Sequence, residues 1–283
     1  MSNGIKFSDE YIEVLKNFLK VSKGTKKNEI LFFKEDNSSM ISLMDMGALV
    51  HVKTSDQHAT YQNEFGVANI GELMDYIKAI NYPKVGDINI ATETSTKGKS
   101  FECVVLNDEY VKYRMIVADP TRFETKRDKK VPISRDKDPM ELVSSFIVTQ
   151  DDLDKLTNDI KLMKGCEFFG VTVNTDVSFY MRGIERQQVT RQIDPVKCKI
   201  NNSTVLASDG IDKFRQFPAR IFNFMSYFKI DFEVELRYTG ENRNLVGFKA
   251  FGKVAVDGKD DIEVFIGATE STSQSQNNFD IIE

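Results

Sequence analysis

The sequence contains an internal repeat: SDEYIEVLKNFLKVSKG (8–24) matches TQDDLDKLTNDIKLMKG (149–165) half a chain length away. Each segment starts with a hydroxyl side chain that can cap a helix, continues with acidic residues that suit the helix dipole, and ends with glycine, which favours a left-handed C-terminal cap. Caps and core positions recur in unrelated helices, whereas matched polar positions are less expected. The matched pairs are Leu15 and Leu156, Asn17 and Asn158, Leu19 and Ile160, Lys20 and Lys161, and Lys23 and Lys164. The repeat therefore predicts that a whole domain is duplicated.

Short strands dominate the rest of both halves. The strand segments are rich in β-branched and aromatic residues, and many alternate polar with apolar positions. Each half adds a second helix after several strands, at 69–81 and at 217–229, with Pro218 in the first turn of the latter. Helices are few and lie between runs of strands. This order predicts an α+β fold with antiparallel sheets.

A charged segment separates the two halves. Residues 119–139 hold three of the six prolines, seven basic residues and five acidic residues, with few large apolar side chains. Such a composition buries little apolar surface, so we expect an exposed linker. The predicted organisation is a first domain at 1–118, a linker at 119–139, a second domain at 140–273 and a C-terminal tail at 274–283.

The composition is typical of a globular protein without covalent or metal cross-links. Hydrophobic residues make up 41% of the chain, enough for a core, and the formal net charge is -5. The three cysteines, Cys103, Cys166 and Cys198, contain no CxxC pair, so neither a disulfide framework nor a zinc site is expected. The start of the sequence lacks the apolar stretch of a signal peptide, and no apolar run is long enough to span a bilayer. We therefore expect no membrane partner.

No arrangement of residues calls for catalysis. The two histidines, His51 and His58, are too few for a convincing metal site. No P-loop, GxSxG or GxGxxG string occurs in a suitable context. We expect a binding protein that is not an enzyme and needs no cofactor or metal. An enzyme whose site has no recognisable motif is a distant alternative.

The repeat and four short strings resemble the DNA sliding clamps, which are the ring-shaped processivity factors of DNA polymerases. EVLKNFLKVSKG opens the first half, VTQDDLDKLTNDIKLMKG opens the second, YRMIVADP runs into the linker and FIGATESTS lies near the C-terminus. The likeness covers nearly the whole chain and is strongest to the trimeric clamps of T-even-like bacteriophages. The long charged linker, the C-terminal tail and the enlarged loop GIERQQVTRQIDPVK depart from that pattern.

The resemblance implies two similar domains, each with antiparallel sheets outside and two helices inside, that assemble as a homotrimeric ring around duplex DNA. An edge strand near 110–117 of one subunit would pair with an edge strand of the second domain of the next. The implied partners are a DNA polymerase and an ATP-dependent clamp loader, and the implied location is the cytoplasm, of the host cell if the protein is viral. The other open interpretation is a non-enzymatic viral structural or assembly protein with two β-rich domains.

Lysines on the predicted helices are the candidate DNA contacts. Lys16, Lys20 and Lys23 follow i, i+4, i+7 spacing and so lie along one helical stripe. A lysine is a flexible point charge that meets phosphates without fixed geometry, and phosphate contacts carry no sequence information. With the resemblance, the candidate set is Lys16, Lys20, Lys23, Lys78, Lys161, Lys164 and Arg220. The alternative is a solvated helix face, the commoner meaning of a lysine stripe opposite an apolar stripe.

The resemblance also implies an apolar partner pocket between the domains, under the linker and beside the C-terminal strand. The matching residues are Val131, Ile133, Phe265, Ile266, Gly267 and Ala268. An equally good interpretation makes Phe265 and Ile266 ordinary strand residues, one facing in and one facing out. The tail QNNFDIIE loosely resembles a clamp-binding peptide, although a solvated tail is the better interpretation.

Overall fold

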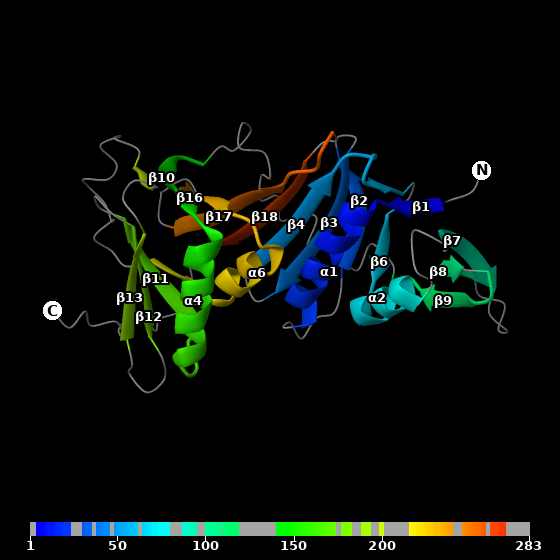
Figure 1. The fold of residues 1–283 in the computed structure, drawn as a ribbon, viewed down its shortest axis with the longest axis horizontal. Helices are drawn as coiled ribbons and strands as arrows, with labels where there is room; N and C mark the ends of the chain where they lie inside the picture. The colour runs from blue at the N-terminus through cyan, green and yellow to red at the C-terminus, as the bar shows by residue number, and fades with distance from the viewer. Residues whose placement is uncertain are drawn as a thin grey trace.

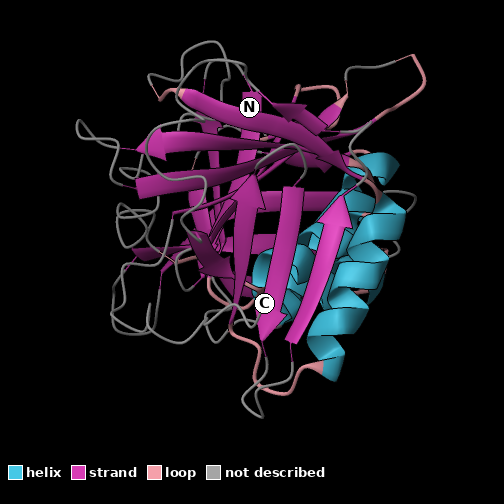
Figure 2. Cartoon of the chain, turned by 90° about the vertical axis from the view of Figure 1, so that its left-hand side faces the viewer, coloured by secondary structure: helices cyan, strands magenta, loops and turns pink. Residues whose placement is uncertain are grey.

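Four helices lie on one side of three antiparallel sheets (Figures 1 and 2) in the described part of the chain. The computed structural model describes residues 4–23, 30–35, 38–45, 48–61, 64–79, 87–94, 100–107, 109–118, 140–173, 177–182, 188–193, 198–200, 215–239, 245–258 and 261–269. The predicted α+β fold with antiparallel sheets is confirmed. Within these ranges, no helix has both the length and the apolar character that crossing a membrane requires.

Two of the sheets each belong to one half of the chain. The five-stranded sheet has the order β5 (Ala59–Thr60), β1 (Gly4–Phe7), β7 (Asp87–Thr94), β8 (Ser100–Asn107) and β9 (Lys112–Ile116). The four-stranded sheet has the order β13 (Gln188–Ile193), β12 (Val177–Arg182), β11 (Phe168–Val173) and β15 (Arg215–Pro218). Strands β9 and β13 therefore each lie at the edge of a sheet.

The third sheet has nine strands and joins the two halves. Its order is β14 (Cys198–Ile200), β10 (Leu142–Val148), β16 (Phe232–Thr239), β17 (Leu245–Val254), β18 (Ile262–Thr269), β4 (Ala48–Thr54), β3 (Ser38–Asp45), β2 (Ile30–Glu35) and β6 (Phe65–Val67). The halves meet where β18 pairs antiparallel with β4, with Ile266 opposite Val50. We call this pairing, together with the packing of α1 on α6, the intrachain junction.

The two halves of the chain that share the sequence repeat also share one order of strand connections. Cutting the nine-stranded sheet at the intrachain junction leaves β14-β10-β16-β17-β18, which has the same connection order as β5-β1-β7-β8-β9. The remainder, β4-β3-β2-β6, has the same order as β13-β12-β11-β15. Strand β9 is thus the counterpart of β18, and β13 is the counterpart of β4. The two strands that join the halves have counterparts that are both sheet edges.

The helices form one row. They are α1 (Asp9–Lys23), α2 (Ile70–Ala79), α4 (Gln150–Leu162) and α6 (Arg220–Phe228). Helix α1 packs on α2 and α6, and α6 packs on α4, which gives the order α2–α1–α6–α4 (Figure 1). Figure 2 shows this helix layer at one side of the strands. The predicted arrangement of helices on one face and sheets on the other is present in the single chain.

The predicted caps of the repeated helices are confirmed where the structure describes them. The Tyr11 amide donates to Ser8 Oγ at 3.1 Å. Thr149 and Asp152 form a reciprocal capping box at the start of α4, and Gly165 beyond its end has φ of 71°. Glycine suits that left-handed position because it carries no Cβ.

Two local predictions differ from the structure. Strands β1 and β10, which lead directly into α1 and α4, are not among the strands predicted from sequence. The placement of Pro218 in the first turn of a helix is wrong, because Pro218 is the last residue of β15, opposite Phe168, and α6 begins at Arg220. Strand β15 is an edge strand, where a residue without an N–H group costs the sheet little.

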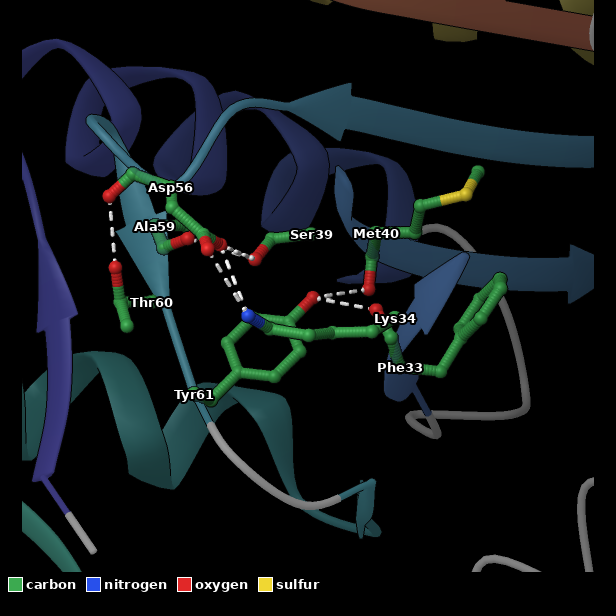
Figure 3. Close-up of polar contacts among 8 residues, drawn as sticks. All are labelled: Phe33, Lys34, Ser39, Met40, Asp56, Ala59, Thr60 and Tyr61. Carbon is green, nitrogen blue, oxygen red and sulfur yellow. Dashed lines mark hydrogen bonds and ion pairs between the residues drawn. The ribbon is translucent and has the colours of Figure 1, made fainter. Parts of the chain in front are cut away.

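A polar cluster beside β2 and β3 fixes the start of α1 (Figure 3). Tyr61 Oη lies 2.9 Å from the Phe33 carbonyl oxygen and 2.6 Å from that of Met40, and its one proton is shared between them. Ser39 Oγ donates to the Ala59 carbonyl oxygen at 2.7 Å, which holds the 55–61 segment against β3. The same segment accepts a 2.7 Å hydrogen bond from the Ser8 amide through the His58 carbonyl oxygen. The N-cap of α1 is therefore anchored to the sheet.

Candidate nucleic-acid interface

The described cationic candidates all lie on the helix layer. Lys20, Lys78, Lys161 and Lys164 are exposed, while Lys16 and Arg220 are half-buried. Lys164 follows the end of α4, and Lys23 is the last residue of α1, where its side chain lies outside the described residues. The exposed lysines of α1 and α2 lie opposite the buried stripes that face the sheets. The structure thus brings residues from both halves onto one layer.

The two described lysines of α1 have weak local partners. Lys16 pairs with Glu13, one turn earlier on the same exposed face. Lys20 Nζ donates to Asn17 Oδ1 at 3.0 Å, with the same spacing. Exposed pairs of this kind contribute about 0–1 kcal/mol each. A phosphate could therefore replace either partner at little cost.

Charge is graded along both repeated helices. In α1 the exposed side chains run from Asp9 and Glu13 to Lys20, and in α4 they run from Asp151 and Asp154 to Lys161. Acids at the N-terminus and lysines at the C-terminus stabilise a helix through its dipole, which accounts for part of the pattern. Helices α1 and α4 also run in the same direction (Figure 1). Their lysine-rich ends therefore lie along the same edge of the layer.

Lys155 has an exposed cationic side chain that is not among the sequence-predicted contacts. It lies on α4, and its counterpart in the repeat is Val14, which is buried in α1. Matching the two helices selects the residues they share, so a position where they differ goes unnoticed. Lys155 and Leu162 lie seven residues apart, so helical spacing places them on the same side of α4, and Leu162 is 70% exposed. This spacing is the sequence signal that could have indicated Lys155.

The predicted partner pocket is only partly described, because Val131 and Ile133 lie outside the described residues. Phe265 and Ile266 point to opposite faces of β18, as the ordinary-strand interpretation expects, but both are buried. Ile266 belongs to the main core, whereas the Phe265 ring lies 6.0 Å from the ring of His51 and 5.2 Å from that of Phe251, centroid to centroid. Gly267 and Ala268 follow on the same strand and are also buried.

The face of the nine-stranded sheet that carries Phe265 is apolar around His51. His51 is buried, and desolvation lowers its pKa to about 3, so the imidazole is neutral at physiological pH. Within the described ranges, His51 Nδ1 and the hydroxyl of Ser42 on the neighbouring strand have no hydrogen-bond partner. Leu31, Phe33, Met40 and Ala118 cluster on this face, with Phe33 in edge-to-face contact with His51. Ala118 is the last described residue before the predicted linker.

His58 and the described cysteines, the other residues that could bind a metal, are part of the packed structure. His58 Nδ1 lies 3.0 Å from Ser8 Oγ, Cys103 is buried, and Cys166 Sγ donates to the Phe168 carbonyl oxygen at 3.3 Å. Among the residues that the structure describes, no group of three or more potential ligands could hold a metal ion.

The chain is similar in structure to two proliferating cell nuclear antigens. It matches the protein from Entamoeba histolytica with a TM-score of 0.57 and 11% identity, over 96% of this chain and 100% of that one. It matches the protein from Thermococcus kodakaraensis with a TM-score of 0.53 and 12% identity, over 95% and 99%. The chain has the sliding-clamp fold. No family model and no curated protein matches the sequence.

Proposed function

We propose that the protein is a ring-shaped sliding clamp that encircles duplex DNA, tethers a replicative DNA polymerase and so raises its processivity. One observation carries this proposal: the row α2–α1–α6–α4 lies on one side of the sheets and exposes lysines from both halves of the chain. On the sliding-clamp fold, such a layer would line a central hole, with the sheets as the outer wall.

In this mechanism the lysines contact phosphates and read no bases. The proposed contacts are Lys16, Lys20, Lys23, Lys78, Lys161, Lys164 and Arg220. Phosphate contacts are independent of sequence and weaken with salt, which lets a protein move along DNA. Tethering converts each rebinding of the polymerase into an intramolecular event at an effective concentration of about millimolar for short tethers. No catalysis and no cofactor is needed for this role.

Ring closure would use the edge strands β9 and β13. Residues at and beside β9 expose large apolar side chains, with Tyr110 at 89% and Ile116 at 67%. Exposed edges and apolar side chains invite pairing with another chain. Head-to-tail contacts between β9 and β13 of successive copies would close the ring as a homotrimer. Each copy would consist of a first domain at 1–118, a linker at 119–139, a second domain at 140–273 and a tail at 274–283.

A closed ring requires further partners. It cannot thread onto circular DNA unaided, so an ATP-dependent clamp loader would open it. The polymerase would dock on the sheet face around Phe265, with Val131 and Ile133 completing the pocket. We place the protein in the cytoplasm, of the host cell if its source is a bacteriophage.

Two measurements test the proposal. The protein should stay on linear DNA whose ends are blocked by bulky groups and should leave the same DNA when the ends are free. Equal retention on both would exclude sliding and would favour a structural or assembly role. Light scattering should give the mass of a trimer, and a stable monomer at micromolar concentration would exclude the ring.

A further inference from the structure

The intrachain junction shows how one flank of α1 and one edge of β4 are covered. Helix α1 has a neighbour on each side, α2 on one and α6 on the other. Val14 and Phe18, which lie one turn apart on α1, are both buried. On β4, Val50 and Val52 face the same core and are also buried. This junction is therefore closed by apolar side chains.

The equivalent flank in the second half is open and charged. In the repeat, Val14 corresponds to Lys155 and Phe18 corresponds to Asp159. On β13, the core-facing position near the helix is Arg191, whose Nη2 lies 2.6 Å and Nε 3.1 Å from Asp159 Oδ2. Leu162, one turn beyond Asp159, is 70% exposed. An ion pair thus occupies a place that apolar side chains fill at the intrachain junction.

We propose that this open flank, made of Lys155, Asp159, Leu162 and Arg191, receives α2 and β9 of a second copy, and that its ion pair makes the junction between copies the salt-labile one. The inference rests on the proposed ring. The occupant follows from the repeat, because the counterparts of α2 and β9 are α6 and β18, the elements that cover α1 and β4 within the chain.

The surface offered by the second copy complements this flank. Helix α2 carries Glu72 and the exposed Asp75, opposite in charge to Lys155. Glu72 accepts a 2.5 Å hydrogen bond from Tyr76, whose ring stacks on Tyr113 of β9 at 4.7 Å between centroids. This contact joins α2 to β9 as one surface. Exposed Ile116 and Tyr110 at β9 provide apolar area that suits Leu162.

The ion pair weakens this junction for a physical reason. Burying two charges removes their hydration, so a buried ion pair often does no better than apolar side chains of similar volume. At physiological ionic strength the Debye length is about 8 Å, so added salt also screens charge attraction across the rim of the contact. Raising salt should separate the copies while each chain stays folded, and a loader would open the ring at the same place.

The test compares the dissociation constant of the oligomer in low and high sodium chloride. The double substitution Asp159→Phe with Arg191→Val installs the side chains found at the intrachain junction. We expect it to lower the dissociation constant at least ~10-fold and to flatten its salt dependence, since 1.4 kcal/mol corresponds to tenfold. Asp159→Asn alone should raise the dissociation constant, because it leaves the Arg191 charge without its partner. This single change decides the question if the double variant does not fold.

A matched control is available at the intrachain junction. Lys53 and Glu263 form an ion pair there, with 3.8 Å between Nζ and Oε2 and both side chains partly exposed. Lys53→Gln with Glu263→Gln should leave the oligomer unchanged. A wild-type oligomer that responds neither to salt nor to Asp159→Asn overturns the inference and leaves the ring standing. A wild-type protein that is monomeric in all conditions overturns the proposed function itself.

Discussion

The phenyl ring of Phe265 lies over Gly267 so closely that a Cβ on Gly267 would come within 2.7 Å of Phe265 Cζ. The ring has little room to move, because it also packs against His51 and Phe251 on neighbouring strands. Glycine is required here for space, on the sheet face where the polymerase pocket is proposed.

Gly267→Ala should therefore destabilise the protein by about 1–3 kcal/mol, the usual cost of forcing extra volume into a packed site. Denaturant unfolding measures the effect. Adding Phe265→Leu should recover part of the loss, since the smaller side chain frees the space. Gly71→Ala on α2 is the matched control: its Cβ would meet its nearest neighbour at 3.6 Å, and alanine favours a helix. A Gly267→Ala variant as stable as the wild type would contradict the close contact.

Tyr61→Phe should cost about 1–3 kcal/mol of stability, because two buried carbonyl oxygens lose their donor (Figure 3). Tyr11 provides the opposite case. Its hydroxyl is buried and has no hydrogen-bond partner within the described ranges, so Tyr11→Phe should be neutral or stabilising. Thermal unfolding of the two variants side by side checks both signs. Equal losses would show that the hydroxyl of Tyr61 has no special role.

Stability should fall in acid because of His51. Burial lowers its folded-state pKa to about 3 from an ordinary value of 6.5, so the unfolded chain binds a proton that the folded chain does not between these values. The stability linked to His51 is full above pH 6.5 and is lost as the pH falls toward 3, with about 2 kcal/mol gone by pH 5. His51→Leu should remove this part of the pH dependence. If the wild type and the variant lose stability in parallel between pH 7 and pH 5, His51 is not the titrating group.

Reversing the charge of two matched lysines tests the proposed DNA contacts on the helix layer. Lys20→Glu with Lys161→Glu should weaken DNA association at least about tenfold and reduce its salt dependence, because phosphate contacts are lost. The mass in light scattering should not change. Lys6→Glu is the control, since exposed Lys6 alternates along β1 with the core residues Ile5 and Phe7. Unchanged DNA association in the double variant would restore the solvated-face interpretation.

Much of the local structure could be predicted because it depends on neighbouring residues. Ser8 and Thr149 cap their helices as predicted, and both second helices form close to their predicted ranges. Strands β1 and β10 were missed because their pairing partners, such as β7 and β16, are distant in sequence, and β1 has only four residues. Pro218 was misplaced because a proline at the edge of a sheet and one in the first turn of a helix leave the same local pattern.

The candidate site also contains residues that could be predicted from the sequence and residues that could not. The repeated lysines could be found from the sequence, since helical spacing places them on one stripe, and their contact with DNA stays a prediction. Lys155 and its flank could not be found, because the sequence does not say which side of a helix a neighbour covers. Val14 is buried and Lys155 is exposed on equivalent positions. Helix α6 packs beside α1 from the other half of the chain, and we infer that it covers Val14.

Local sequence signals suffice to predict the two-fold repeat, the ends of the repeated helices and the α+β class, because caps, periodicity and turns act over a few residues. The pairing of β18 with β4, the buried face shared by Phe265 and His51, and the free edges at β9 and β13 emerge in the folded chain alone. Those outcomes depend on the pairing of segments some two hundred residues apart. The folding of the whole chain selects that pairing, and no local preference specifies it.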